Sequence, residues 1–303
     1  MIEDKGPVFN SKILLFGEYS LMKGSMALSI PYEKFNGQLK FDSKSYNEKS
    51  KHFSVDYLGE YLDFLEVNNL GEILDLPTFK SDLEHGLYFK CNIPISYGLG
   101  SSGAIVAAIY NAYSLSNESN NLEELKSIFS RMESYYHGES SGLDPLVSFL
   151  NSSILITEDN NLKTFSLPKK SAQNTLDMFL IDTKSSGETQ PLVNWFLKKY
   201  EDVNYRNKIQ NQLIPINNNC IVNFLDGNHK ALINYLRTLS EFTFENMNPM
   251  IPASINSIWK KGLETGNYYL KLCGSGGGGM MLGFSDNLKN AMYELQDYEI
   301  HSL

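Results

Sequence analysis

The stretch that decides the fold is PISYGLGSSGAIVAAIY, which runs from Pro94 to Tyr110. An apolar segment that predicts a strand, a glycine-rich loop and an apolar segment that predicts a buried helix follow one another directly. Gly98, Gly100 and Gly103 let the backbone approach a phosphate closely and adopt a positive φ. The helix beginning near Ser101 would point its free N–H groups and the positive end of its dipole at that anion. We therefore predict a phosphate-binding loop here.

Two other phosphate-loop motifs fit this segment less well. The segment matches G-x-G-x-x-G, the dinucleotide fingerprint, which requires an acidic residue on a second strand about 20 residues later. Glu123 and Glu124 stand at that distance, but in a segment with helical periodicity. A Walker A loop requires a lysine before its Ser or Thr, and this loop has none. A helix cap with packing glycines remains the structural alternative.

The flanking sequence mixes strands and helices without a regular β-α-β rhythm, which predicts an α+β (mixed α/β) fold. Predicted strands cover residues 12–16, 25–32, 37–45, 86–96, 152–159, 162–167, 178–184, 268–273 and 280–284. Predicted helices cover residues 55–67, 104–116, 121–138, 195–203, 228–242, 253–266 and 286–298. The run Asn217 to Asn219 predicts a loop.

Composition and charge narrow the class of protein. The chain has 303 residues, of which 42% are hydrophobic and 20% charged, enough for a substantial core in one large or two moderate domains. A net charge of -9 without a basic stripe argues against nucleic acid and anionic membranes as partners. No apolar run approaches the ~20 residues of a membrane span, and no signal peptide is visible. Three widely spaced cysteines suit a reducing cytoplasm.

Three glycine-containing segments carry a resemblance to a known family. Pro94 to Ser102 reads P-x-x-x-G-L-G-S-S and resembles the second signature of the GHMP kinases. KILLFGEYSLMKGSMAL, from Lys12, is similar to the first signature, and KLCGSGGGGMMLGF, from Lys271, to the third. Because the three occur in order across nearly the whole chain, it is identified as a member of this family. Within the family its pattern is most similar to that of the mevalonate kinases.

The resemblance implies a two-lobed GHMP kinase fold with ATP and the acceptor in the cleft between the lobes. It implies an N-terminal, ribosomal-protein-S5-like lobe over residues 1–170 and a C-terminal, ferredoxin-like lobe over residues 171–303. The segment LPKKSAQN, residues 167–174, is the best candidate for the linker.

The resemblance also assigns the binding of ATP to two glycine-rich stretches. These residues are Pro94, Gly98, Leu99, Gly100, Ser101, Ser102, Gly103, Gly274, Gly276 and Gly277. The later stretch could equally form a tight hairpin between two strands, and both descriptions can hold together.

The acidic residues lie in RMESYYHGESSGLDPLVSF, from Arg131 to Phe149. The resemblance implies that Glu133 and Ser102 bind Mg²⁺, an ion that usually takes one or two protein oxygens and keeps water and phosphate as its other ligands. It implies that Asp144 faces the acceptor hydroxyl and that Lys12 supplies a cation. Sequence leaves open whether Asp144 accepts the proton or orients the hydroxyl. Ordinary alternatives are a solvated helix charge for Glu133, a turn or N-cap for Asp144 and a surface charge for Lys12.

Four further residues are expected at the acceptor. Glu18 and Tyr19 stand where mevalonate kinases have Glu-His, and Thr183 and Lys184 resemble an Asn-Thr-Lys segment of those enzymes. Tyr19 in place of histidine is one departure from the pattern. The missing Pro-Gly before Lys12 is another.

The resulting expectation is an ATP-dependent kinase that converts mevalonate to 5-phosphomevalonate for isoprenoid precursor synthesis. A phosphomevalonate kinase or another GHMP sugar or metabolite kinase is the alternative, and a non-catalytic metabolite sensor is a more distant one. Dimers are common in the family, so the resemblance allows a homodimer that no residue here proves.

Overall fold

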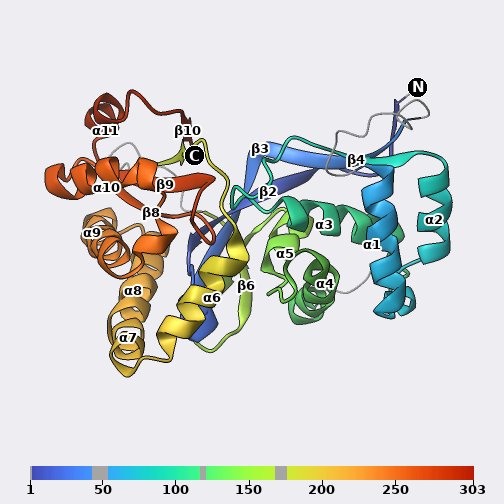
Figure 1. Cartoon of the computed structure of the whole chain (residues 1–303), viewed down its shortest axis with the longest axis horizontal. Helices are drawn as coiled ribbons and strands as arrows, with labels where there is room; N and C mark the ends of the chain where they lie inside the picture. The colour runs from blue at the N-terminus through green and yellow to red at the C-terminus, as the bar shows by residue number, and fades with distance from the viewer. Residues whose placement is uncertain (1, 43–53, 117–120, 168–175) are drawn as a thin grey trace. The chain divides into compact units, whose positions relative to one another are not determined.

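The computed structural model describes residues 2–42, 54–116, 121–167 and 176–303. The chain divides into two compact units, described separately below (Figure 1). The first unit comprises Met1–Lys12, Pro31–Pro94 and Gly100–Ser152, and the second comprises Ile13–Ile30, Ile95–Leu99 and Ser153–Leu303. The predicted lobe boundary between residues 170 and 171 lies outside the described residues and stays a prediction.

The sheet of the first unit is built on β3 (Ala27–Asp42), whose later part belongs to this unit. It pairs antiparallel with β1 (Ile2–Asp4) and with β4 (Leu87–Cys91). The register sets Leu39 opposite Phe89, and both side chains are buried. Along β4, buried and more accessible positions alternate, as a sheet with one covered face requires.

The helices of the first unit include the buried helix predicted after the phosphate loop, α3 (Ser101–Tyr113). Its apolar side chains are buried almost all round, and it packs against α4 (Leu122–His137) and α5 (Leu143–Leu150). Figure 1 shows these three helices on one side of β4. The outer helices are α1 (Val55–Val67), which has the predicted bounds, and α2 (Leu76–Glu84). A short helical turn, η3, covers Leu70–Glu72.

The second unit has its own four-stranded antiparallel sheet, in the order β10-β7-β9-β8. Its strands are β7 (Asp177–Asp182), β8 (Tyr269–Leu272), β9 (Met280–Ser285) and β10 (Ile300–Ser302). Every residue of β8 and β9 is buried. A separate hairpin, β5 (Ser153–Ile156) and β6 (Leu162–Phe165), pairs with the beginning of β3. The strand β2 (Phe9–Phe16), like β3, has residues in both units.

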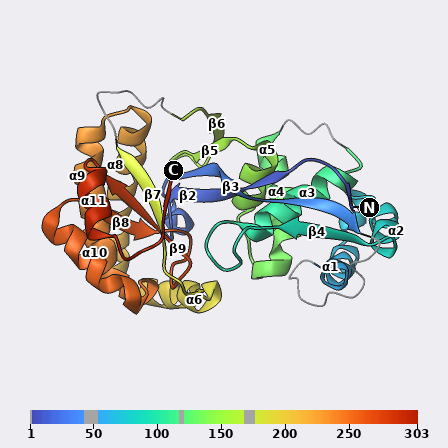
Figure 2. The same ribbon diagram turned by 90° about the horizontal axis from the view of Figure 1, so that it is seen from above.

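Helices cover the sheet of the second unit. Figures 1 and 2 show α8, α9 and α10 along one side of it, and α9 and α10 contact β8. The helices are α6 (Thr189–Tyr200), α7 (Val203–Lys208), α8 (Ile214–Leu225), α9 (His229–Asn246), α10 (Ala253–Thr265) and α11 (Leu288–Glu294). Short helical turns are η1 (Leu21–Lys23) and η5 (Asn248–Met250), and a π-helical segment, η4 (Ile209–Leu213), connects α7 to α8.

The asparagine run expected to be a loop is instead part of α8, and that prediction was wrong. Asn217 Nδ2 donates to the carbonyl of Met26 at 2.9 Å, and Asn218 Oδ1 accepts from the amide of Met26 at 3.0 Å. Both asparagines are buried. A buried backbone amide and carbonyl need partners, and these side chains supply them, which local propensity cannot reveal.

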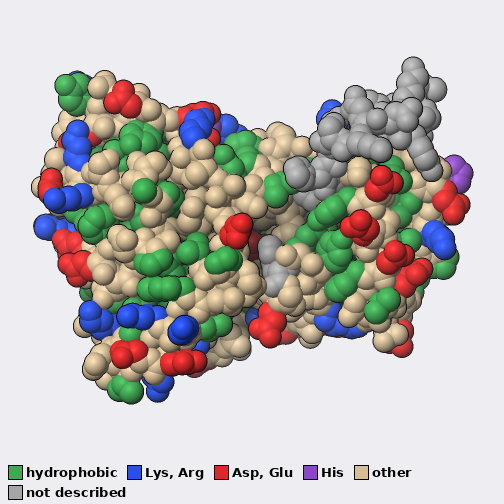
Figure 3. Space-filling view, viewed as in Figure 1, with side chains coloured by type: hydrophobic (Ala, Val, Ile, Leu, Met, Phe, Trp, Pro, Cys, Tyr) green, Lys and Arg blue, Asp and Glu red, His purple; other side chains and the backbone are tan. Residues whose placement is uncertain are grey.

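Strands paired antiparallel and helices outside any β-α-β repeat confirm the predicted α+β class. Within the described part of the chain, no helix combines the length and the apolar character needed to cross a membrane. On the face drawn in Figure 3, acidic and basic side chains are interspersed over the described residues.

Candidate active site

Lys12 and Asp144 form a close ion pair in the first unit. Lys12 Nζ lies 2.9 Å from Asp144 Oδ2, and the lysine is 4% exposed. Lys12 comes from β2 and Asp144 from the first turn of α5. A buried ammonium needs a charged or hydrogen-bonding partner, and the carboxylate provides one.

The N-terminus of α3 lies against both members of this ion pair. A Cβ placed on Gly100, the N-cap of α3, would come within 2.8 Å of the Lys12 side chain. A Cβ placed on Gly103 would lie 2.7 Å from the backbone carbonyl carbon of Asp144. Glycine at these two positions therefore allows a cation, a carboxylate and the free N–H groups of a helix to come together.

Glu133 forms a second polar cluster beside α3. Ser102 Oγ donates to Glu133 Oε1 at 2.9 Å, and Ser140 Oγ donates to Glu133 Oε2. The Glu133 side chain reaches this place from α4 and is 3% exposed. Burial, together with the negative charge of Asp144, raises the pKa of Glu133 to about 7, against the lowering effect of the two serines and Lys12.

The donor set of this cluster suits Mg²⁺. The described residues include no group of three His, Cys, Asp or Glu side chains placed to hold a metal ion. A hydroxyl and a carboxylate oxygen match an ion that takes one or two protein ligands and completes its shell with water and phosphate. Because a carboxylate must lose its proton to bind a metal ion, Mg²⁺ bound there would compete with the proton of Glu133.

In the second unit, the first part of the phosphate loop lies directly against the third glycine-rich segment. A Cβ on Gly98 would come 2.2 Å from the carbonyl oxygen of Cys273, and one on Gly279 would come 2.4 Å from Tyr97 Cα. The amide of Met280 donates to the carbonyl of Tyr97 at 3.2 Å. The two segments meet backbone to backbone, an approach that only glycine permits.

The glycines predicted in the third segment all adopt left-handed conformations, with φ of 74° at Gly274, 75° at Gly276 and 77° at Gly277. The amide of Gly277 donates to the carbonyl of Met250 at 2.6 Å. The segment joins β8 to β9, so it is also the tight hairpin given as the alternative.

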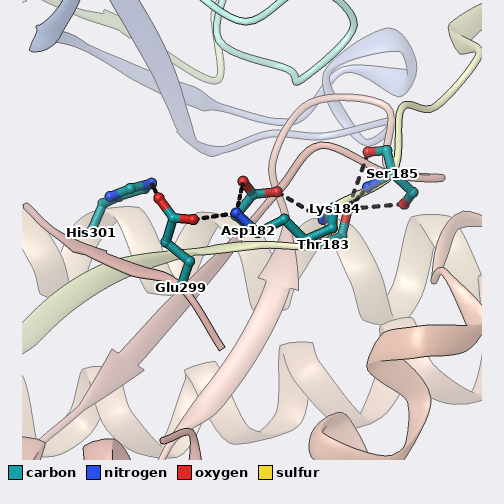
Figure 4. Close-up of polar contacts among 6 residues, drawn as sticks. All are labelled: Asp182, Thr183, Lys184, Ser185, Glu299 and His301. Atoms are coloured by element: carbon teal, nitrogen blue, oxygen red, sulfur yellow. Dashed lines mark hydrogen bonds and ion pairs between the residues drawn. The ribbon is translucent and has the colours of Figure 1, made fainter. Parts of the chain in front are cut away.

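Thr183 and Lys184 follow β7 in the second unit. The amide of Thr183 donates to the carbonyl of Gly279 at 3.0 Å, which ties this turn to the third glycine-rich segment. Figure 4 shows the Lys184 ammonium directed at two carboxylates, 3.1 Å from Asp182 Oδ2 and in an ion pair with Glu299. These hydrogen bonds raise the pKa of Lys184.

Glu18 and Tyr19 also belong to the second unit. Glu18 forms a buried ion pair with Lys271, which comes from the middle of β8. The Tyr19 hydroxyl donates to the carbonyl of Ser275 at 2.6 Å, and burial raises the pKa of this tyrosine. Both residues therefore contact the strand or loop of the third glycine-rich segment.

Comparison with known proteins agrees with this geometry. Residues 67–152 match the family model described as the GHMP kinases N terminal domain. These residues are therefore similar to the GHMP kinases N terminal domain. This match agrees with the resemblance to the GHMP kinases, and its range includes the second of the three signatures. The matched range holds α3, Glu133 and Asp144.

Sequence relatives of this chain are named mevalonate kinases. The enzyme of Thermococcus onnurineus is 29% identical over 216 residues, which cover 64% of this chain and 61% of that protein. The chain thus matches less than two thirds of the relative's length.

Solved structures show the fold. An L. major mevalonate kinase in complex with R-mevalonate aligns with a TM-score of 0.66 at 16% identity, covering 99% of this chain and 96% of that one. Streptococcus pneumoniae phosphomevalonate kinase aligns with a TM-score of 0.65 at 13% identity, covering 100% of this chain and 99% of that one. The predicted GHMP kinase fold is therefore confirmed.

Most of the predicted site residues contact residues of their own unit. Two of these contacting residues, Ser140 and Lys271, are not among those predicted from the sequence. Ser140 contacts Glu133 and accepts from the amide of Gly142 at 3.0 Å. Lys271 is the charged residue of an otherwise apolar strand, YLKL. A lysine inside an apolar strand indicates a buried charge, and a buried charge requires a partner. The sequence therefore contains a signal that could have identified Lys271.

Proposed function

We propose that this protein is an ATP-dependent small-molecule kinase with a magnesium requirement. The observation that carries the proposal is the Lys12–Asp144 ion pair in contact with the N-terminus of α3. Phosphoryl transfer depends on positioning and charge neutralisation more than on covalent chemistry, and this arrangement provides both.

In the proposed reaction, the acceptor hydroxyl attacks the γ-phosphorus of ATP and the bond to the ADP oxygen breaks. Lys12 stabilises negative charge on the attacking oxygen and on the transferring group. Asp144 orients the hydroxyl and is placed to accept its proton. Ser102 and Glu133 would hold magnesium, which when bound neutralises charge on the phosphate oxygens.

We further propose that the two glycine-rich stretches bind the phosphates of ATP. The N–H groups at the beginning of α3, at Ser101 to Gly103, favour an anion there. The backbone that leads into this helix contains Pro94, Gly98, Leu99 and Gly100. The contacts of Gly98 with Cys273 support a role for the third segment in holding the loop.

For the acceptor we propose mevalonate, with 5-phosphomevalonate as the product. The names of the sequence relatives and the arrangement of Glu133 and Asp144 support this choice. Thr183 and Lys184 stay predicted substrate contacts, although Lys184 would have to exchange a carboxylate partner for the substrate. Phosphomevalonate is the second candidate, because a phosphomevalonate kinase shares the fold at similar TM-score. We expect a cytoplasmic protein that binds neither nucleic acid nor membrane, and a homodimer is compatible with the family.

The test is an ADP-release assay with ATP, magnesium and a panel of mevalonate, phosphomevalonate, galactose and homoserine. We expect turnover with mevalonate that stops when magnesium is chelated. Turnover with another member of the panel would keep the kinase proposal and replace the acceptor. Nucleotide binding without turnover of any acceptor would favour a metabolite sensor on the same fold.

A further inference from the structure

An ion pair between Glu18 and Lys271 lies in the interior of the second unit. The side chains are 8% and 4% exposed, so both charges are removed from water almost completely. Placing two charges there is costly unless geometry and further hydrogen bonds compensate. Such a pair contributes little net stability, but it fixes the positions of the residues around it.

The ammonium of Lys271 holds the strand that leads into the third glycine-rich segment. Besides Glu18, Nζ donates to the carbonyl of Leu272 at 2.8 Å. The next residue, Cys273, is the one whose carbonyl lies against Gly98. Lys271 is thus two residues away from the backbone contact between the two glycine-rich stretches.

Tyr19 makes a second connection to the same segment. Its hydroxyl donates to the carbonyl of Ser275 at 2.6 Å, and its ring lies 4.9 Å from the ring of Phe196. Its φ is 59°, a left-handed conformation that is strained for a bulky residue. Such strain persists only where the surroundings hold it, and it is concentrated at functional sites.

The segment that follows Glu18, as far as Met26, is also held by hydrogen bonds. Asn217 and Asn218 bind the backbone of Met26, and Ser25 Oγ donates to Ser20 Oγ at 2.8 Å. A cavity of about 20 Å³ adjoins the ion pair and is lined by residues that include Glu18, Lys271, Asn217 and Thr243. A space of that size holds about one water molecule, too little for a metabolite.

We propose that Lys271, Glu18 and Tyr19 form a clamp that positions the third glycine-rich segment for nucleotide binding. In this clamp, Lys271 and Glu18 are positioning residues: they act through Cys273 and Ser275 on the loop and do not touch the acceptor. The inference rests on the proposed function only in assigning the nucleotide to this loop. It competes with the prediction that Glu18 contacts the substrate.

The experiment compares the full chain with Lys271→Met, Glu18→Gln, the double variant and the conservative variant Lys271→Arg. Binding of the non-hydrolysable analogue AMPPNP with magnesium is measured by calorimetry, and the KM for the acceptor by ADP release. Hydrogen exchange of the amides of residues 272–279 reports the order of the loop directly. Lys260→Met serves as control, because Lys260 forms an exposed ion pair with Glu264 in the same unit.

We expect each single variant to weaken AMPPNP binding about tenfold or more and to speed exchange in residues 272–279. Because the two residues act as one unit, the double variant should lose no more AMPPNP affinity than the single variant with the larger loss. It also leaves no unpaired buried charge, so it stays informative if Lys271→Met fails to fold. Lys271→Arg should restore part of the affinity, and Lys260→Met should change neither readout.

The proposal is overturned if Glu18→Gln raises the acceptor KM while AMPPNP affinity and loop exchange stay unchanged, since Glu18 would then contact the substrate. Additive losses in the double variant would also overturn it. Absence of turnover with intact AMPPNP binding would count against the kinase activity, while the clamp would still be decided by the binding and exchange data.

Discussion

At the scale of single residues, Asp144 carries the sharpest prediction. Asp144→Asn should lower kcat by about a hundredfold or more, because a group that orients or deprotonates the hydroxyl is lost while the shape is kept. Asp56→Asn is the matched control, since Asp56 also lies in the first turn of a helix, α1, but is exposed. Steady-state kinetics and AMPPNP binding measured side by side give the answer. Near-normal kcat in Asp144→Asn would remove this residue from the chemistry.

Glu133 carries a prediction about pH at the same scale. Its folded pKa of about 7 lies above the ordinary 4.5, so the metal-free folded protein retains a proton that the unfolded chain has released. The resulting stabilisation is full below pH 4.5 and is lost as the pH rises through 7. We expect a decline in the free energy of unfolding on the order of 3 kcal/mol over this range.

Denaturant unfolding between pH 4 and 8, without metal, measures this decline. Glu133→Gln should flatten it, because glutamine does not titrate there, whereas Glu124→Gln, on an exposed position of the same helix, should not. An equally steep decline in Glu133→Gln would show that another group is responsible. Glu133→Gln should also need a higher magnesium concentration for activity, because it replaces a charged ligand with a neutral one.

At the scale of elements, the contact between the two glycine-rich segments depends on glycine itself. Gly98→Ala should lower the free energy of unfolding by about 3 kcal/mol or more and weaken nucleotide binding. Gly98 combines a φ of 76° with a Cβ position 2.2 Å from the carbonyl oxygen of Cys273. Gly227 has a φ of 67° but no atom within 4 Å of its Cβ position. Gly227→Ala should therefore cost only the left-handed backbone, about 1–2 kcal/mol.

Equal losses in these two alanine variants would show that the contact with Cys273 can relax. Denaturant unfolding gives the stability, and AMPPNP titration shows whether the loop keeps its function. The comparison separates backbone strain from the steric clash, which a single glycine substitution cannot do.

At the scale of the whole molecule, bound ligand should raise stability by mass action. At a free AMPPNP concentration about 100 times its Kd, with magnesium, the gain is about 2.7 kcal/mol, which corresponds to a rise in Tm of about 4 °C. Differential scanning calorimetry measures it. Chelation of magnesium should remove most of the rise, and AMP, which lacks the β- and γ-phosphates, should give little. A rise that survives chelation would contradict the magnesium role of Ser102 and Glu133.

The sequence by itself determined the fold class and the places of the chemical groups. Continuous apolar runs and period-3.6 patterns located α1, α3 and β9, because burial imposes those patterns on the local sequence. The order strand, glycine loop, helix located the phosphate loop for the same local reason.

Only the tertiary structure decided which residues contact one another. Asn217 and Asn218 look like loop residues, yet they satisfy the backbone of Met26, 191 and 192 residues away along the chain. Glu18 is predicted to contact the substrate, which stays a prediction, and the structure pairs its charge with Lys271 across 253 residues. Such contacts are set by packing and by the need of each buried polar group for a partner, and no local pattern records which distant residue will meet that need.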